Sequence, residues 1–196
     1  MNIPLWLAYA GTALAGVYFL GIVARRKFTL ARCAFALGMV VLGVESLFAG
    51  WALSAVHPAD IITWQSWRLV ALSFLPGPWI LFSQHYARGD GLRFALWKKV
   101  VLAALALVPP MLGLWFRDDL VVAIRPSVFA FQSVLTLGWP AHVIHVGFLL
   151  GAVMVLSNLE RTYRASVGTI RWRIKFMLLG LGLLFVLYVL LIGDPL

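Results

Sequence analysis

The sequence has little charge of any kind, and negative charge is the scarcer sign. Of 196 residues only 12% are Asp, Glu, Lys or Arg, and just 7 are acidic. A soluble domain carries roughly twice that charged fraction, because its surface must stay hydrated. Hydrophobic residues make up 63% of the chain, and the mean hydropathy is +0.96. This balance excludes an ordinary soluble domain and predicts an integral membrane protein.

Cysteine and catalytic motifs are also scarce. The one cysteine, Cys33, excludes an internal disulfide and any CxxC or Cys/His metal site. The sequence contains no glycine-rich phosphate loop, no HExxH and no GxSxG. We therefore predict that this chain is not an enzyme and holds no metal. The first residues, "MNIPLWLAYAG", lack the basic segment of a cleaved signal peptide, so we expect them to begin a retained membrane helix.

Long apolar runs are abundant. A membrane-spanning helix needs about 20 mostly apolar residues. Six stretches meet this requirement, at residues 3–24, 33–56, 64–86, 100–116, 137–159 and 176–192. The predicted fold is an all-α bundle of six transmembrane helices that forms a single domain over residues 1–196. Residues 117–136, the longest piece between spans, are expected to lie at the membrane surface.

Most of the basic residues follow the first, third and fifth predicted spans, and only Arg68, Arg117 and Arg125 lie elsewhere. The loop residues concerned include Arg25, Arg26, Lys27, Lys98, Lys99, Arg171, Arg173 and Lys175. By the positive-inside rule these loops are cytoplasmic, which places both termini outside. We expect a multi-pass protein of the bacterial cytoplasmic (inner) membrane whose basic loops face anionic headgroups. The net charge of +9 then reflects topology, and no nucleic-acid partner is predicted.

One acidic residue, Glu45, falls inside an apolar run, "VVLGVESLFAGWA". A charge at that depth costs at least about 2.5–3.5 kcal/mol, so it should face inward and be paired. Its helix face carries mostly small residues, which suit contact with another helix: Gly38, Val41, Leu42, Ala49 and Ala52. We predict an ion pair with Arg68 of the next span. The pair either locks two helices together or forms the centre of a sensing site.

Two further groups of residues can carry function. His142 and His145 are three residues apart on one helix face, a spacing that suits haem or metal ligation as well as a polar packing or ligand-binding face. No cofactor is predicted, and haem is kept as an alternative. Prolines fall within or at the ends of spans and are expected to kink the helices at Pro76, Pro78, Pro109, Pro110 and Pro140. Kinked helices occur in sensor bundles and also line the cavities of transporters.

Two stretches carry a family resemblance. They are "WRLVALSFLPGPWILFSQHYARGD", from Trp67 to Asp90, and "NLERTYRASVGTIRWRIKFMLLGLG", from Asn158 to Gly182. Together with Glu45 they resemble the N-terminal membrane region of sensor histidine kinases of the PEP-CTERM/exosortase system (PrsK-like). The resemblance implies a sensory, signal-transducing input domain of a two-component system, part of a seven- or eight-span bundle, that dimerises. A full-length parent would be a histidine kinase.

The chain contains neither a phosphoacceptor histidine box nor an ATP-binding region. We therefore expect an input domain without its catalytic output. One alternative is a non-catalytic subunit or scaffold of a larger membrane complex. Another is a small transporter or haem-binding membrane protein, on the strength of the prolines and the histidine pair.

The predicted orientation can be tested with single cysteines in a Cys33→Ser background. In intact spheroplasts, a membrane-impermeant maleimide should label His57→Cys, which lies between the second and third spans. Asp90→Cys, which lies between the third and fourth, should react only after the membrane is permeabilised. The reverse pattern would show that the orientation is wrong.

Overall fold

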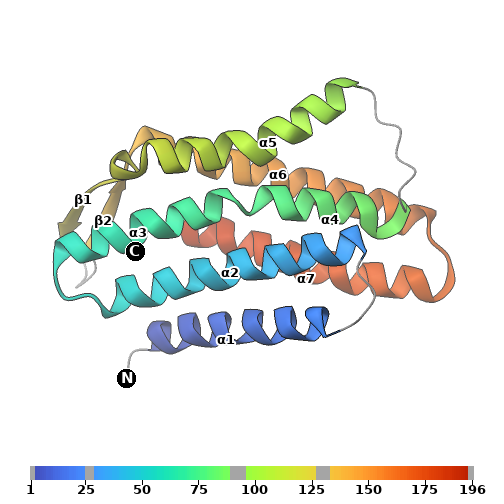
Figure 1. Ribbon diagram of the computed structural model, residues 1–196, viewed down its shortest axis with the longest axis horizontal. Coiled ribbons are helices and arrows are strands. Elements are labelled where there is room, and N and C mark those ends of the chain that lie inside the picture. The colour runs from blue at the N-terminus through green and yellow to red at the C-terminus, as the bar shows by residue number, and fades with distance from the viewer. Residues whose placement is uncertain (1–2, 25–28, 89–95, 127–132, 194–196) are drawn as a thin grey trace.

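The computed structural model describes residues 3–24, 29–88, 96–126 and 133–193. Within these ranges it contains seven α-helices, one short 3-10 helix and a two-stranded hairpin (Figure 1). The helices are α1 (Ile3–Val23), α2 (Leu30–Ser54), α3 (Pro58–Ser73), α4 (Pro76–Arg88), α5 (Leu96–Trp115), α6 (Trp139–Ala165) and α7 (Gly168–Gly193). The 3-10 helix η1 (Arg117–Asp119) precedes strands β1 (Val121–Pro126) and β2 (Ser133–Leu137).

The helices form an elongated antiparallel bundle. Figure 1 shows that α3 and α4 lie end to end and together make one pass along the bundle. The start of α1 and the end of α7 lie at the end of the bundle that also carries β1 and β2, here called the hairpin end. The other end, where α6 turns into α7, is called the opposite end.

Three of the described helices are long and apolar enough to cross a membrane, over Pro4–Val23, Leu30–Ser54 and Trp139–Ala165. These three candidate spans indicate a multi-pass membrane protein. The third predicted span is instead divided into α3 and α4, which have 16 and 13 residues. The described apolar stretches of α5 and α7, Val100–Trp115 and Ile174–Leu183, are shorter than a span.

The division between α3 and α4 follows from proline chemistry. Helix α4 begins at Pro76, and the residue before a proline is disfavoured in helical conformation. Helix α3 closes just before it with tight turns, in which the amides of Phe74 and Leu75 donate to the carbonyls of Ala71 and Leu72. The predicted kink at Pro76 and Pro78 is thus a complete break in the helix.

The other prolines behave differently from one another. Pro109 and Pro110 lie inside the continuous helix α5. Pro140 lies in the first turn of α6, so the prediction that it kinks a helix is wrong. Backbone N–H groups in the first turn of a helix have no acceptor within the helix, so proline, which lacks this group, loses no hydrogen bond there. The fixed φ of proline also favours helix initiation.

The hairpin adds a small β element to a fold that is otherwise the predicted all-α bundle. Its strands pair antiparallel, from Val121 opposite Leu137 to Pro126 opposite Ser133. Leu120 and Val121 are buried against the helices, and the Gly138 amide donates to the Leu120 carbonyl at 3.0 Å. Residues 117–126 and 133–137 therefore close one end of the bundle, where the sequence indicated only a surface segment.

The core is centred on α6. Its side chains Ile144, Phe148 and Val155 are almost fully buried. Gly147 and Gly151 form a GxxxG pair, and each faces a proline: a Cβ at Gly147 would lie 3.0 Å from Pro109, and one at Gly151 would lie 3.0 Å from Pro76. The two glycines thus let the proline-bearing segments of α4 and α5 approach the α6 backbone closely.

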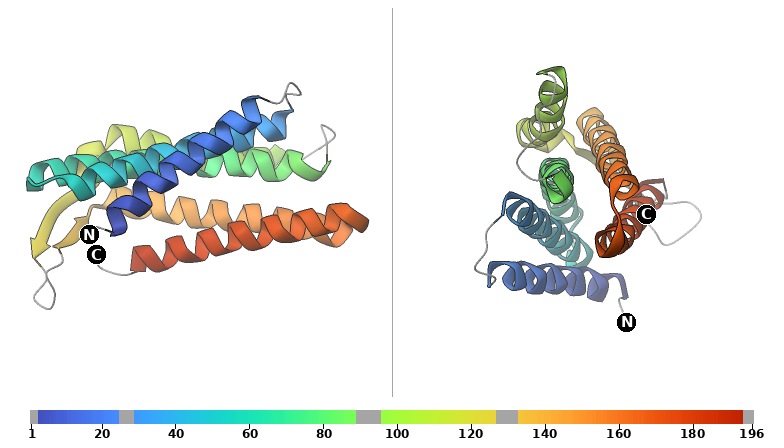
Figure 2. Two further views of the ribbon diagram at one scale, coloured as in Figure 1. Left: turned by 90° about the horizontal axis from the view of Figure 1, so that it is seen from below. Right: turned by 90° about the vertical axis from the view of Figure 1, so that its right-hand side faces the viewer.

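Helix α1 lies at the edge of the bundle, alongside α2 (Figure 2). The contact uses small residues, because a Cβ at Gly43 would lie 3.2 Å from the Ala15 Cβ. The Thr12 hydroxyl lies 3.2 Å from the Ala8 carbonyl and 3.3 Å from the Gly43 carbonyl, so it can donate within α1 or across to α2. Many other α1 side chains are exposed and apolar, as expected of a helix that faces lipid.

The glycine–proline packing predicts that two glycine-to-leucine substitutions in different places will change the stability of the fold by very different amounts. Gly151→Leu should destabilise the fold by about 1–3 kcal/mol or more, because the new side chain must displace Pro76. Gly180→Leu is the matched control, since a Cβ at Gly180 meets nothing within 4 Å. Thermal unfolding of the purified protein in detergent measures both, and equal midpoints would contradict the packing.

Candidate functional site

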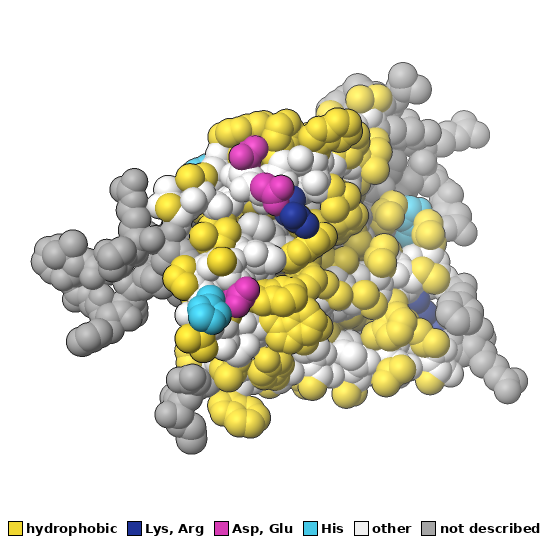
Figure 3. All heavy atoms as spheres, turned by 60° about the vertical axis from the view of Figure 1, so that its left-hand side comes forward, with side chains coloured by type: hydrophobic (Ala, Val, Ile, Leu, Met, Phe, Trp, Pro, Cys, Tyr) yellow, Lys and Arg dark blue, Asp and Glu magenta, His cyan; other side chains and the backbone are white. Residues whose placement is uncertain are grey.

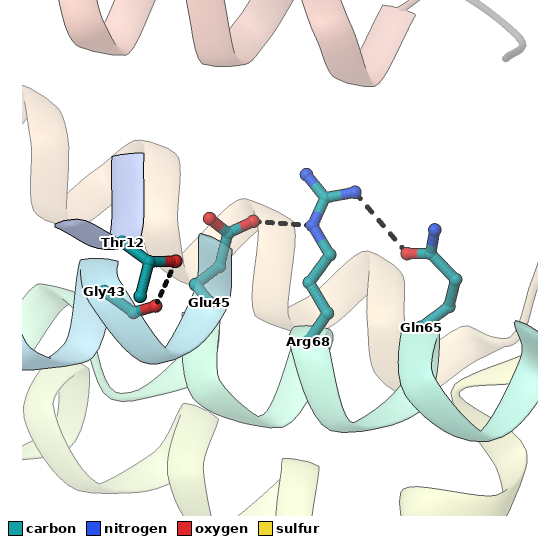
Figure 4. Close-up of polar contacts among 5 residues, drawn as sticks. All are labelled: Thr12, Gly43, Glu45, Gln65 and Arg68. Carbon is teal, nitrogen blue, oxygen red and sulfur yellow. Dashed lines mark hydrogen bonds and ion pairs between the residues drawn. The ribbon is translucent and has the colours of Figure 1, made fainter. Parts of the chain in front are cut away.

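Glu45 and Arg68 form an ion pair between α2 and α3. The Arg68 Nε donates to Glu45 Oε1 at 2.5 Å, and Arg68 Nη1 lies 3.4 Å from Gln65 Oε1 (Figure 4). The Glu45 side chain is 13% exposed and the Arg68 side chain 26% exposed. The structure thus brings together the two residues that the sequence analysis paired, and it adds Gln65, which stands one helical turn before Arg68.

The pair lies well inside the bundle along its length. At about 1.5 Å per residue, Glu45 is roughly 14 Å from the end of α2 at Ser54, and Arg68 is roughly 15 Å from the start of α3 at Pro58. Those helix ends belong to the hairpin end. In a membrane the charges would therefore lie in the apolar layer, where each can be kept ionised by the other.

Aromatic rings lie between the ion pair and the hairpin end. Phe48 and Trp51 of α2 pack on Trp64 and Trp67 of α3, and the closest ring centroids, those of Trp51 and Trp64, are 4.7 Å apart. The Arg117 guanidinium of η1 lies over the Trp67 ring, 5.0 Å from its centroid. We call Phe48, Trp51, Trp64 and Trp67 the aromatic cluster, and Phe48 follows Glu45 by one helical turn.

The small-residue face of α2 makes the contact with α4. A Cβ at Gly38 would lie 3.3 Å from the Trp79 ring, and Phe35 meets the same ring edge to face at a centroid distance of 5.6 Å. Trp79 is 4% exposed. The missing side chain at Gly38 therefore provides the room that seats this indole and fixes α2 against α4.

The two histidines lie in α6 near the hairpin end. His142 Nδ1 lies 2.8 Å from the Gly138 carbonyl oxygen, and His145 Nδ1 lies 2.6 Å from the Ala141 carbonyl oxygen. A carbonyl oxygen only accepts, so Nδ1 carries a proton and donates in both rings. His145 lies within electrostatic range of Arg68, so one of the two predicted histidines is in the neighbourhood of the predicted ion pair.

In the described part of the chain, these histidines belong to no metal-binding cluster. Among the described residues, no group of three or more His, Cys, Asp or Glu side chains could hold a metal ion. What the arrangement offers is a polar group in an apolar bundle, contributed by Glu45 of α2, Gln65 and Arg68 of α3, and His145 of α6. Such a group can form hydrogen bonds with a ligand or change the packing of three helices.

The surface at the hairpin end is mainly apolar, with scattered charge. Figure 3 shows a few acidic, basic and histidine side chains, some of them side by side, among hydrophobic and uncharged polar ones on this face. The exposed acidic residues at this end include Asp60, Asp118 and Asp119, and Asp118 pairs with Arg117 at 2.8 Å. These charges read as surface groups at a membrane boundary.

The opposite end carries described basic residues of α6 and α7. Arg164 pairs with Glu160, Arg171 lies over the Tyr163 ring, and Lys175 lies over the Trp172 ring. Arg25, Arg26 and Lys27 lie outside the described residues, as do the side chains of Lys98, Lys99 and Arg173. Cationic and aromatic side chains at one end are typical of a membrane interface that faces anionic headgroups.

Comparison with known proteins gives no match for this arrangement. No protein-family model, no curated protein and no solved structure matches the chain.

The ion pair predicts that substitutions of Glu45 and Arg68 will have non-additive effects on the free energy of unfolding. Glu45→Gln or Arg68→Gln alone should lower the free energy of unfolding by about 2 kcal/mol or more, because each leaves a mostly buried charge without its partner. The double variant should lose less than the sum of the two single losses, by about 1–3 kcal/mol. Denaturant unfolding in detergent measures the cycle.

The matched control cycle is Glu160→Gln with Arg164→Gln. That pair has the same charges at helical spacing, but its side chains are 50% and 77% exposed. Its coupling should be only about 0.3–0.5 kcal/mol. Additive losses at positions 45 and 68 would show that the two charges do not stabilise each other.

Proposed function

We propose that the chain is the membrane-embedded sensory input domain of a histidine-kinase-like protein of a two-component system. In this proposal α1, α2, the pair α3–α4, α5, α6 and α7 make six spans in a bacterial inner membrane, with both termini outside. The observation that carries the proposal is the Glu45–Arg68 ion pair close to His145, since such a polar group in an apolar bundle is costly without a role.

The division between α3 and α4 supports a signalling role. Arg68 lies in α3, on the hairpin-end side of the break at Phe74 and Leu75, while α4 continues to the opposite end. Two helices joined at a proline break can tilt separately, whereas a continuous helix moves as one rod. A change at the ion pair can therefore shift α3 and pass to α4 as an altered angle at Pro76.

Contacts between α4 and α6 provide the next step toward the cytoplasmic side. Pro76 packs on Gly151, and the Asn158 side-chain amide donates to the Ser83 hydroxyl at 3.3 Å. Asn158 and Ser83 lie closer to the opposite end than Arg68 does. Movement of α4 would thus reach the end of α6, which we place at the cytoplasmic face with its basic residues.

The proposal can be tested by phosphoryl transfer in native membranes. Membranes that contain the natural full-length protein are incubated with radiolabelled ATP, and the tagged protein is purified with its partners. We expect acid-labile phosphate on the polypeptide or on a protein that purifies with it. Glu45→Gln should change the amount of phosphate about threefold or more, since about 0.7 kcal/mol suffices to shift a two-state equilibrium by that factor.

Glu160→Gln is the control, because it removes the same charge from an exposed pair at the opposite end. It should leave the phosphate level unchanged. Absence of acid-labile phosphate, or identical levels in wild type and Glu45→Gln, would contradict the kinase-linked function. Stable co-purification of other membrane proteins without phosphate would instead favour a non-catalytic subunit of a larger complex.

A further inference from the structure

The Glu45 carboxylate has an open acceptor. Its Oε1 accepts from Arg68, while its Oε2 points away from Arg68 and accepts no hydrogen bond in the described part of the chain (Figure 4). Among the described residues, Trp79 Nε1 is the one buried side-chain polar atom that has no hydrogen-bond partner. Oε2 has no partner either and is not such a buried atom, so it is not sealed inside the protein. An ionised carboxylate has room for about four hydrogen bonds. This oxygen is therefore at least partly accessible and has room to accept a further hydrogen bond.

The charges around this oxygen indicate what kind of donor fits. Glu45 and Arg68 cancel each other, and Gln65 is neutral. His145 uses its Nδ1–H for the hydrogen bond to the Ala141 carbonyl. A charged ligand at Oε2 would bring a further net charge into apolar surroundings, which is costly even where the carboxylate attracts it, and an anion there would also be repelled by the carboxylate. A neutral hydroxyl group donates to Oε2 without either penalty.

The apolar and aromatic residues around the ion pair indicate what the remainder of the ligand is like. The ion pair lies about 14 Å from the hairpin end, in apolar surroundings. Between it and that end lies the aromatic cluster, in which Trp51 is 37% exposed. Aromatic rings at a membrane boundary pack well against groups that have an apolar face and a polar edge. Sugar and polyol headgroups carried on an apolar chain have this character.

We propose that the Glu45–Arg68 pair and the aromatic cluster bind an uncharged amphiphile with a hydroxyl-bearing headgroup, whose hydroxyl donates to Glu45 Oε2. The inference rests on the proposed sensory function, for which it names the class of signal. Binding adds a hydrogen bond to Glu45 and weakens its hold on Arg68. The α2–α3 contact is thereby the element that responds to the ligand.

The test uses the chain in lipid nanodiscs and three probes that share one alkyl chain. These are octyl glucoside, octyl sulfate and octyltrimethylammonium, each titrated below its micelle concentration while tryptophan fluorescence is recorded. We expect a saturable change with octyl glucoside, and only linear partitioning with the two charged probes. Equal responses to all three probes would overturn the proposal, since they would reflect apolar partitioning alone.

Variants at position 45 separate binding from folding. Glu45→Gln should weaken glucoside binding roughly tenfold or more, the cost of losing a hydrogen bond to a charged acceptor. Glu45→Asp keeps the charge but shortens the side chain by one methylene group, so it should weaken binding by a smaller factor. It replaces Glu45→Gln as the test if Glu45→Gln does not fold. Glu160→Gln should bind like wild type. Unchanged affinity in both Glu45 variants would overturn the proposal.

The outcome is independent of kinase activity, because the binding assay contains neither ATP nor a phosphoacceptor. Loss of the glucoside signal together with normal, Glu45-dependent phosphorylation would remove this ligand class and leave the sensory function standing. Saturable, Glu45-dependent binding without any phosphoryl transfer would retain the ligand site and remove the kinase link.

Discussion

A charge in an apolar layer has to be neutralised by the protein itself, and this constraint organises the bundle around Glu45. A carboxylate inside a membrane helix is costly unless it is paired, and α3 places Arg68 opposite Glu45. Gln65 of α3 lies beside the guanidinium, and His145 of α6 is within electrostatic range of it.

Glycine residues elsewhere in the bundle allow its helices to pack closely against one another. Hydrophobic burial gives little attraction between helices in lipid, so close packing has to supply it. The chain achieves close packing with complementary shapes: glycine against proline at α6, glycine against indole at Gly38, and glycine against alanine at Gly43. Each is a place where a missing side chain receives a bulky or rigid neighbour.

The sequence predicted the helical fold and the ion pair for clear physical reasons. Apolar length shows directly in composition, and a lone acid in an apolar run requires a cation on a neighbouring helix. The aromatic cluster and the closeness of His145 to Arg68 were beyond reach, because they depend on how α3 and α6 are rotated about their axes. The hairpin was missed since Val121–Pro126 and Ser133–Leu137 are apolar enough to read as a membrane-surface segment. Pro140 was misjudged because a proline's effect depends on whether it starts a helix or interrupts one, and that boundary was uncertain by a few residues.

The GxxxG pair of α6 has a consequence for assembly. Gly147 and Gly151 form a motif that, in many membrane helices, marks the seam between two subunits. Here both glycines are buried, and their surfaces are already covered by Pro109 and Pro76 of the same chain. The motif is used for packing within one chain, so it does not mark the interface of a dimer. Any second copy of the chain has to associate through a different helix face.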